Sequence, residues 1–249
     1  MEESFARVEV KYMLSLAQAA AMEEALGYEG FGKMDFGCPR VQSLYYDTGD
    51  HALIRASLER PAYKEKLRLR AYGEPGRITQ SFVEIKKKYA GVVYKRRAAL
   101  PLKAAQRGLP AGLLPEEAGQ VGREALWLVK RYGLRPAAVI AYDRDAWFSA
   151  RESDVRITFD RNLSFRDWAP DLNAQTHSLP LIGPELRLME IKTNGTYPLW
   201  LTRLLEAVGA RRVHFSKYGL AYKTYIQPGK EGFKEIQVKC STVSLSRGA

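Results

Sequence analysis

Two neighbouring segments of the sequence each combine a charged face with an apolar face. In Lys64–Arg70 every even position is Lys or Arg, whereas Leu67 and Leu69 occupy odd positions. The second segment, Phe82–Lys88, alternates in the same way, with a Glu and two Lys on one face and Val and Ile on the other. Because side chains alternate across a strand with period two, each segment predicts a strand with one charged side. Stripes this rich in Lys and Arg repel one another unless an anion lies between them. The pattern therefore predicts a polyanionic ligand.

The same separation of charged and apolar faces recurs along the chain. The charged faces are Arg7/Glu9/Lys11, Lys66/Arg68/Arg70, Glu84/Lys86/Lys88, Lys95/Arg97, Arg144, Arg156 and Glu190/Lys192. If the apolar faces pack outward against helices, the charged faces converge on an interior, and a barrel of about eight strands has room for one small ligand. We therefore predict an α+β fold: a closed antiparallel β-barrel, or tunnel, of about eight strands with flanking helices. The alternative places the charged faces in solvent around a sandwich core. Exposure to solvent is the more common explanation for a charged face on one strand, but it explains seven such segments less well.

Helices are predicted between the strands. Ser15 is a suitable N-cap for a helix that ends near Leu26, and residues 198–208 form an amphipathic pattern with a Pro near its first turn. Helical periodicity also extends from Glu116 to Tyr132. By contrast, residues 101–115 are rich in Pro, Gly and Ala and predict a connector.

Composition favours one large domain with a basic surface. The chain has 249 residues, 46% of them hydrophobic, and a formal charge of +11, which favours phosphate-rich partners. We predict a domain over residues 1–227 and a tail over 228–249. Cys38 and Cys240 have neither zinc-site nor disulfide-framework spacing, so a reducing cytoplasm is the default location. The N-terminus lacks the pattern of a signal peptide, and no apolar run approaches the ~20 residues of a membrane span.

Several of these segments, taken in order, resemble the VTC domain, the polyphosphate polymerase domain of the vacuolar transporter chaperone complex, which also occurs as stand-alone bacterial proteins. The segments are Arg7–Tyr12, Ser43–Asp47, Lys66–Arg70, Glu84–Lys86, Lys95–Arg97, Tyr142–Trp147, Val155–Asp160, Met189–Lys192 and Phe215–Tyr218. The resemblance covers roughly residues 5 to 225. The VTC domain belongs to the triphosphate tunnel metalloenzyme (CYTH-like) superfamily, so the resemblance implies a tunnel fold.

The resemblance also implies a reaction and the residues that carry it. The reaction transfers the γ-phosphate of ATP to a growing polyphosphate chain and releases ADP. Guanidinium groups match phosphate oxygens in bidentate fashion, and ammonium groups add charge, so the cations would position and neutralise the phosphates. The expected catalytic residues are Lys11, Arg68, Arg70, Arg144 and Lys217. The expected phosphate-binding residues are Lys66, Lys86, Lys95, Arg97, Arg156 and Lys192.

A divalent metal, Mn²⁺ or Mg²⁺, is the expected cofactor, because hard cations prefer oxygen ligands and neutralise phosphate charge. Glu190 is the best candidate ligand. Glu84 and Glu9 either assist it or only pair with neighbouring cations. Hydrolase and cyclase members of the superfamily begin with Glu-x-Glu-x-Lys, whereas the first acidic position here is Arg7. This departure favours the polymerase branch.

Two other functions stay open. One is a tunnel hydrolase that cleaves inorganic triphosphate or nucleoside triphosphates with a metal-activated water. The other is a non-enzymatic binder of polyphosphate or nucleic acid, which the net charge permits. Nucleic acid is not the expected ligand, because the cations are spread over strand faces and no RNA-binding aromatic motif is present. The expected partners are ATP and polyphosphate or triphosphate, and a membrane-protein partner is compatible with the resemblance.

Overall fold

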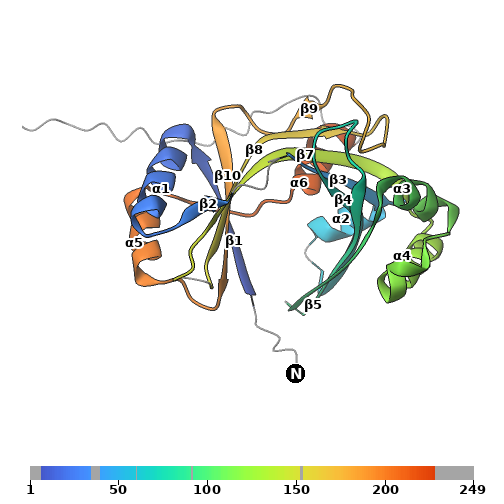
Figure 1. Cartoon of the computed structure of the whole chain (residues 1–249), viewed down its shortest axis with the longest axis horizontal. Helices are drawn as coiled ribbons and strands as arrows, with labels where there is room; N and C mark the ends of the chain where they lie inside the picture. The colour runs from blue at the N-terminus through green and yellow to red at the C-terminus, as the bar shows by residue number, and fades with distance from the viewer. Residues whose placement is uncertain (1–6, 35–39, 60, 91, 152–153, 228–249) are drawn as a thin grey trace, which may run out of the picture.

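The computed structural model describes residues 7–34, 40–59, 61–90, 92–151 and 154–227 (Figure 1). The predicted tail, 228–249, lies outside the described residues. One antiparallel sheet organises the molecule, and its strands follow the order β11-β1-β10-β8-β7-β3-β4-β5-β6. In that order the strands are Arg212–Val213, Arg7–Ser15, Leu186–Asn194, Arg156–Arg166, Arg135–Phe148, Arg40–Asp47, Tyr63–Tyr72, Gln80–Tyr89 and Val92–Pro101. Two short strands lie off this path: β2 (Gly32–Met34) pairs with β7, and β9 (Leu179–Pro180) pairs with β8.

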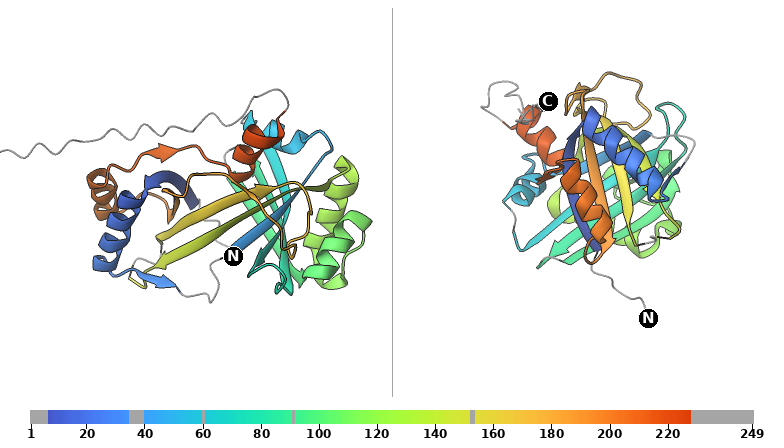
Figure 2. Two further views of the ribbon diagram at one scale, coloured as in Figure 1. Left: turned by 90° about the horizontal axis from the view of Figure 1, so that it is seen from above. Right: turned by 90° about the vertical axis from the view of Figure 1, so that its left-hand side faces the viewer.

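Helices cover the outer face of the sheet in two groups. Helices α1 (Leu16–Tyr28) and α5 (Leu199–Ala207) lie over one half, whereas α3 (Leu102–Ala111) and α4 (Gly119–Tyr132) lie over the other (Figures 1 and 2). The predicted N-cap is confirmed, because the Ser15 hydroxyl accepts a hydrogen bond from the backbone N–H of Gln18. No described helix is long and apolar enough to cross a membrane.

Helix α3 occupies the region that its composition predicted to be a connector. It buries Leu102, Ala105 and Leu109, which are spaced so that they share one face of a helix. Pro110 is its penultimate residue. A short 3₁₀ helix, Glu116–Ala118, then leads into α4.

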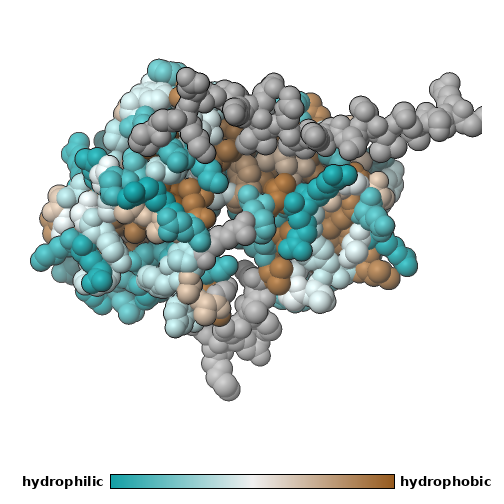
Figure 3. Space-filling model, turned by 180° about the vertical axis from the view of Figure 1, so that it is seen from behind, coloured by the Kyte–Doolittle hydropathy of each residue, from teal (hydrophilic) through white to brown (hydrophobic). Residues whose placement is uncertain are grey.

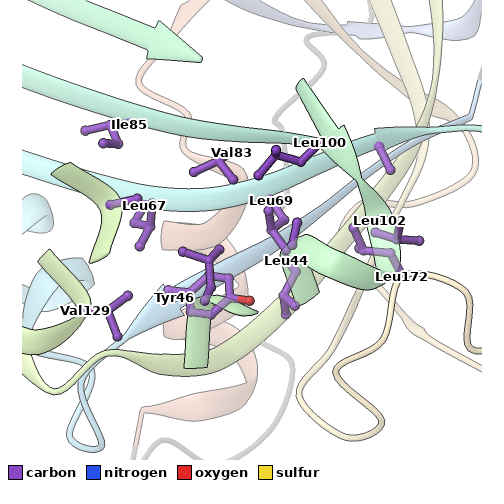
Figure 4. Close-up of a cluster of buried hydrophobic side chains, with 14 of the residues drawn as sticks. Leu44, Tyr46, Leu67, Leu69, Val83, Ile85, Leu100, Leu102, Val129 and Leu172 are labelled. Carbon is purple, nitrogen blue, oxygen red and sulfur yellow. The ribbon is translucent and has the colours of Figure 1, made fainter. Parts of the chain in front are cut away.

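The apolar faces of the strands form the cores beneath these helices, as predicted. Leu67 and Leu69 of β4 pack with Val83 and Ile85 of β5 under α3 and α4 (Figure 4). On the other half, Ile191 of β10 and its neighbours pack against α1 and α5. With their apolar sides held outward, the strands turn their charged sides to the inner face of the sheet.

Part of the inner face is apolar, and two short helices cover it. Helix α2 (Ala52–Leu58) and helix α6 (Lys217–Ala221), which continues into a π-helical turn (Tyr222–Ile226), pack there. Their contacts include Tyr45, Ile54 and Tyr218. Seen from behind, the molecular surface has hydrophobic patches interleaved with hydrophilic side chains (Figure 3). The charged part of the inner face thus has an apolar, packed region beside it.

The sheet is not closed, which corrects the prediction of a closed barrel. In the described part of the chain its path ends at β11 on one side and at β6 on the other. Alternation assigns each side chain to a face, but it does not specify whether the first and last strands pair. Burial lowers the pKa of Lys86 on β5, and Lys11 on β1 adds to this effect, so like charges lie near each other on the inner face of the open sheet. The predicted α+β class and the antiparallel sheet are confirmed.

Candidate functional site

A largely buried group of charges on the inner face joins five elements, and we call it the Glu190 cluster. Arg144 of β7 donates two hydrogen bonds to Asp160 of β8, from Nε to Oδ1 at 2.6 Å and from Nη2 to Oδ2 at 2.7 Å. Lys217 Nζ of α6 lies 2.7 Å from Asp160 Oδ2 and 3.1 Å from Glu190 Oε1 of β10. Lys11 Nζ of β1 lies 3.6 Å from the same Glu190 oxygen. Strands distant in sequence therefore bring these charges together.

Electrostatics keeps both signs of charge in this cluster ionised. Burial would raise the pKa of Glu190, but Lys217, Lys11 and Arg144 outweigh it and hold that pKa well below its usual range. Burial would likewise lower the pKa of Lys217, but Asp160 and Glu190 raise it. The ring of Tyr142 lies 4.5 Å from Lys217 Nζ and 5.1 Å from the Arg144 guanidinium carbon, and it adds cation–π attraction.

A second group, the Glu84 cluster, lies on β4, β5 and β6. Glu84 is 2% exposed and pairs with Arg68 Nη2 at 2.6 Å, Lys95 Nζ at 2.8 Å and Arg70 Nε at 3.7 Å. Burial would raise the pKa of Glu84, but Arg68, Arg70 and Lys95 lower it to about 2. Register explains the arrangement, because Arg68, Glu84 and Arg97 occupy adjacent positions across the three strands. This carboxylate acts as the counterion of the arginines in the free protein.

Other predicted cations of the inner face lack a carboxylate partner of this kind. Lys66 and Lys86 form no ion pair within the described residues, and Lys66 Nζ donates a long hydrogen bond to the Ser216 hydroxyl, at 3.5 Å. Burial lowers the pKa of Lys66 to about 8, and Lys64, Lys86 and Lys11 add to the effect. Lys192 lies 4.0 Å from Glu190, which already has closer partners. The inner face therefore carries more cations than its carboxylates can neutralise.

The remaining predicted residues lie nearer the rim. Arg97 is exposed and stacks on the Phe82 ring at 4.9 Å. Arg156 is exposed and sits beside Lys192 in the β8–β10 register. Glu9 pairs with Lys11 at 3.4 Å. Burial would raise the pKa of Glu9, but Lys11 and Lys86 lower it. The structure thus gathers Lys11, Arg144, Lys217 and Glu190 in one cluster and Arg68, Arg70, Lys95 and Glu84 in another.

The segment between β11 and α6 connects the two halves of the inner face. Lys11 Nζ of β1 donates to the backbone carbonyl of Phe215 at 3.0 Å, and Lys66 of β4 approaches Ser216. Beside this segment is a cavity of about 440 Å³, lined by Glu9, Lys11, Phe215 and residues 212–214. A cavity of that size can hold a small ligand.

Sequence reasoning missed three residues of the site. Asp160 was not predicted as a site residue, although it shares a face with Arg156 by strand alternation, and that signal would have found it. Tyr142 lies under the Glu190 cluster. Tyr45 contacts the Glu84 cluster through Arg68. Both tyrosines lie in segments that carry the VTC resemblance, Ser43–Asp47 and Tyr142–Trp147, and that was the sequence signal for them.

The carboxylates of the inner face are the candidate ligands for Mn²⁺ or Mg²⁺. Among the described residues, no group of three or more His, Cys, Asp or Glu side chains could hold a metal ion. Glu84 pairs with three cations and Glu190 with four. Mg²⁺, however, is commonly held by one or two carboxylates together with substrate phosphates and water. Glu190 and Asp160 share Lys217 and Arg144 as partners, so they would hold an ion of that kind only together with a phosphate ligand that engages these cations, and they do not fit an all-protein metal cage.

Comparison with known families agrees with this geometry. The model of the VTC domain matches residues 6–226, which is most of the chain. The protein belongs to the VTC domain family. The resemblance inferred from the ordered segments is thereby confirmed. No curated protein matches the sequence significantly.

Solved structures with a similar arrangement come from several organisms. A Bacillus halodurans protein, named as a candidate adenylate cyclase, aligns with 11% identity over 84% of this chain and 95% of its own, with a TM-score of 0.49. A Vibrio parahaemolyticus protein with the same description has 16% identity, coverages of 86% and 96% and a TM-score of 0.46. The PH1819 protein of Pyrococcus horikoshii has 14% identity, coverages of 87% and 99% and a TM-score of 0.45. At these identities and scores the similarities say nothing about activity.

Proposed function

We propose that this VTC domain protein is a polyphosphate polymerase that transfers the γ-phosphate of ATP to a polyphosphate chain. The observation that carries the proposal is the inner face, where half-buried and exposed arginines and lysines outnumber the carboxylates around them. Such a face attracts a linear polyanion, because each phosphate can replace a carboxylate as the partner of a guanidinium or ammonium group. Membership of the VTC family supports the choice of phosphate as that anion.

The reaction needs alignment and neutralisation of charge more than covalent help from the protein. A terminal oxygen of the chain attacks the γ-phosphorus of ATP, the bond from that phosphorus to the β–γ bridging oxygen breaks, and ADP leaves. Arg68 and Arg70 on one side and Arg144 and Lys217 on the other would hold the reacting phosphates in line. Lys11 and the lysines without partners would neutralise the rest of the chain. A divalent metal held at Glu190 would, when bound, withdraw charge from the phosphate oxygens.

The open sheet changes where the chain would lie. A closed tunnel would thread the polyphosphate between two mouths, whereas on an open sheet the chain would lie along the inner face between the Glu84 and Glu190 clusters. Product would then leave along this face as it grows. The predictions of a cytoplasmic location, of a single domain over residues 1–227 and of a membrane-protein partner stay predictions.

The test is incubation of the purified protein with ATP and Mn²⁺ or Mg²⁺, with ADP, free orthophosphate and acid-insoluble polyphosphate measured together. A polymerase releases ADP in proportion to the phosphate that enters long chains. Free orthophosphate without chains would indicate the hydrolase instead, and binding of triphosphate without any ADP would indicate a non-enzymatic binder.

A matched pair of variants links the result to the inner face. Arg144→Met removes a cation of the Glu190 cluster, so we expect activity to fall by at least about a hundredfold. Arg161→Met removes an arginine of β8 that pairs with Asp145 on β7, away from both clusters, and activity should persist. Equal activities for the two variants would contradict the placement of the reaction on the inner face.

A further inference from the structure

Tyr45 of β3 connects the charged and apolar parts of the inner face. Its hydroxyl accepts a hydrogen bond from Arg68 Nη1 at 3.0 Å, while Arg68 also pairs with Glu84. The Tyr45 side chain is buried, with 8% of the residue exposed. Its ring stacks on that of Tyr218 of α6, with 4.8 Å between centroids and 23° between planes. One face of Tyr45 is therefore fixed by packing, and its polar end contacts the cation that the proposed reaction uses.

Tyr218 of α6 is held in place by two residues that precede helix α2. Its hydroxyl donates to Asp47 Oδ2 at 3.1 Å, and His51 Nδ1 lies 3.3 Å from the same hydroxyl. Asp47 is fully buried and also accepts from the backbone N–H groups of Thr48, Leu53 and Ile54 at 2.8, 2.9 and 3.1 Å. Burial and the neighbouring Asp47 raise the pKa of Tyr218, so its hydroxyl stays a proton donor. Tyr45 therefore stacks on a support with a fixed position and protonation state.

The charges around Tyr45 come from two strands. Lys66, Arg68 and Arg70 of β4 and Lys86 of β5 face its hydroxyl, and Tyr218 faces it from α6. Burial alone would raise the pKa of Tyr45, but Arg68, Lys66 and Arg70 lower it to about 8. An anion bound by the same cations would weaken this effect and favour the neutral phenol. The neutral phenol, unlike the phenolate, has a proton that it can donate to a phosphate oxygen.

We propose that Tyr45 is a positioning residue of the phosphate site, which holds Arg68 beside the Glu84 cluster and takes up a proton when a phosphate chain binds. This inference rests on the proposed function. It adds a coupling: the affinity for polyphosphate falls as the pH rises and Tyr45 becomes a phenolate. Lys66 contributes in the same direction, because its charge is also lost on the alkaline side, so removing the Tyr45 hydroxyl reduces the coupling without abolishing it.

The test compares Tyr45→Phe with Tyr46→Phe. Tyr46 is a suitable control because it is the next residue of the same strand, belongs to the outer core and has a buried hydroxyl without a hydrogen-bond partner among the described residues. Affinity for metal-free inorganic triphosphate is measured by calorimetry from neutral to alkaline pH. Near neutral pH, Tyr45→Phe should weaken binding by about two- to tenfold through the loss of one hydrogen bond.

Above the pKa of Tyr45, wild-type affinity should fall more steeply than that of Tyr45→Phe, by up to about an extra tenfold per pH unit, since one more proton is taken up. Tyr46→Phe should follow the wild type. Tyrosinate absorbance supplies a second measurement. The wild type should show a titration step near the pKa of Tyr45, moved to higher pH by saturating triphosphate, and Tyr45→Phe should lack it.

The outcomes separate the two proposals. Wild-type protein that binds no triphosphate at any pH overturns the proposed function and the coupling with it. Binding with the same pH profile in wild type and Tyr45→Phe overturns the coupling alone. If Tyr45→Phe does not fold, the wild-type absorbance decides: a step that is absent, or that triphosphate does not move, overturns the inference.

Discussion

Replacing Glu84 by Gln tests whether its carboxylate substitutes for a bound anion in the free protein. The side chain is 2% exposed and pairs with Arg68, Arg70 and Lys95. Its pKa of about 2, against an ordinary value of 4.5, corresponds to a shift of about 2.5 units. At about 1.4 kcal/mol per pH unit, the charged form is stabilised in the folded protein by about 3.5 kcal/mol. Glu84→Gln leaves the three cations without a counterion, so the free energy of unfolding near neutral pH should fall by about that amount.

Urea unfolding with and without triphosphate measures both the stability lost in Glu84→Gln and its recovery when an anion binds. Without ligand, Glu84→Gln should unfold at a lower urea concentration than the wild type. With saturating triphosphate the difference should shrink, because the bound anion takes the place of the carboxylate and stabilises the native state by mass action. Triphosphate affinity should rise about tenfold, which is about 1.4 kcal/mol. A variant with the stability and the affinity of the wild type would refute the reasoning.

Glu124→Gln is the matched control for this experiment. Glu124 of α4 also pairs with two cations, Lys87 and Arg96, but these lie on the outer faces of the same two strands, β5 and β6. We expect a smaller loss of stability, since the Glu124 side chain is 14% exposed against 2% for Glu84, and no change in triphosphate affinity. An equal rise in affinity for both variants would mean that net charge, and not the Glu84 cluster, determines binding.

The sign of the pH dependence follows from the lowered pKa of Glu84. Its contribution is fully present above its unfolded value of 4.5 and is lost as the pH falls toward about 2. Wild-type protein should therefore lose stability in that acidic window, and Glu84→Gln should lose less. Parallel stability curves for the two proteins over this window would contradict the assignment.

Three further outcomes are expected. Glu190→Gln should bind triphosphate at least as well as the wild type but lose metal-dependent ATP turnover by orders of magnitude, and a fully active variant would exclude Glu190 as a metal ligand. Arg70→Ala should weaken triphosphate binding and turnover together, as measured by calorimetry and ADP release, because the Arg70 guanidinium would contact phosphate in both ground and transition states. Triphosphate should raise the melting temperature at low salt, and added salt should shrink that shift; a shift independent of salt would point to a non-electrostatic site.

Strand alternation predicted the faces correctly and left their connections undetermined. The charged sides of β4 and β5 and their apolar opposites follow directly from period two. The pairing of Lys217 with Asp160 and Glu190 does not, because it depends on where α6 lies after the chain leaves β11. The open sheet was missed for a similar reason, since the relation between the first and last strands is a property of the whole sheet. Helix α3 was missed because its Pro and Gly residues outweighed the spacing of Leu102, Ala105 and Leu109.

The free protein limits its own repulsion in three ways, and each responds to an anion. Internal carboxylates pair with the arginines, as at Glu84. The pKa of Lys66, lowered to about 8, allows that amine to give up its charge. The phenol of Tyr45 acquires negative charge more easily than an ordinary tyrosine. A phosphate chain that binds these cations takes the place of the carboxylates as partner of the arginines. Its negative charge also favours the charged amine of Lys66 and the neutral phenol of Tyr45. An inner face built in this way is stable without ligand and still favours a polyanion, and its preference should be strongest on the acidic side of the Lys66 and Tyr45 titrations.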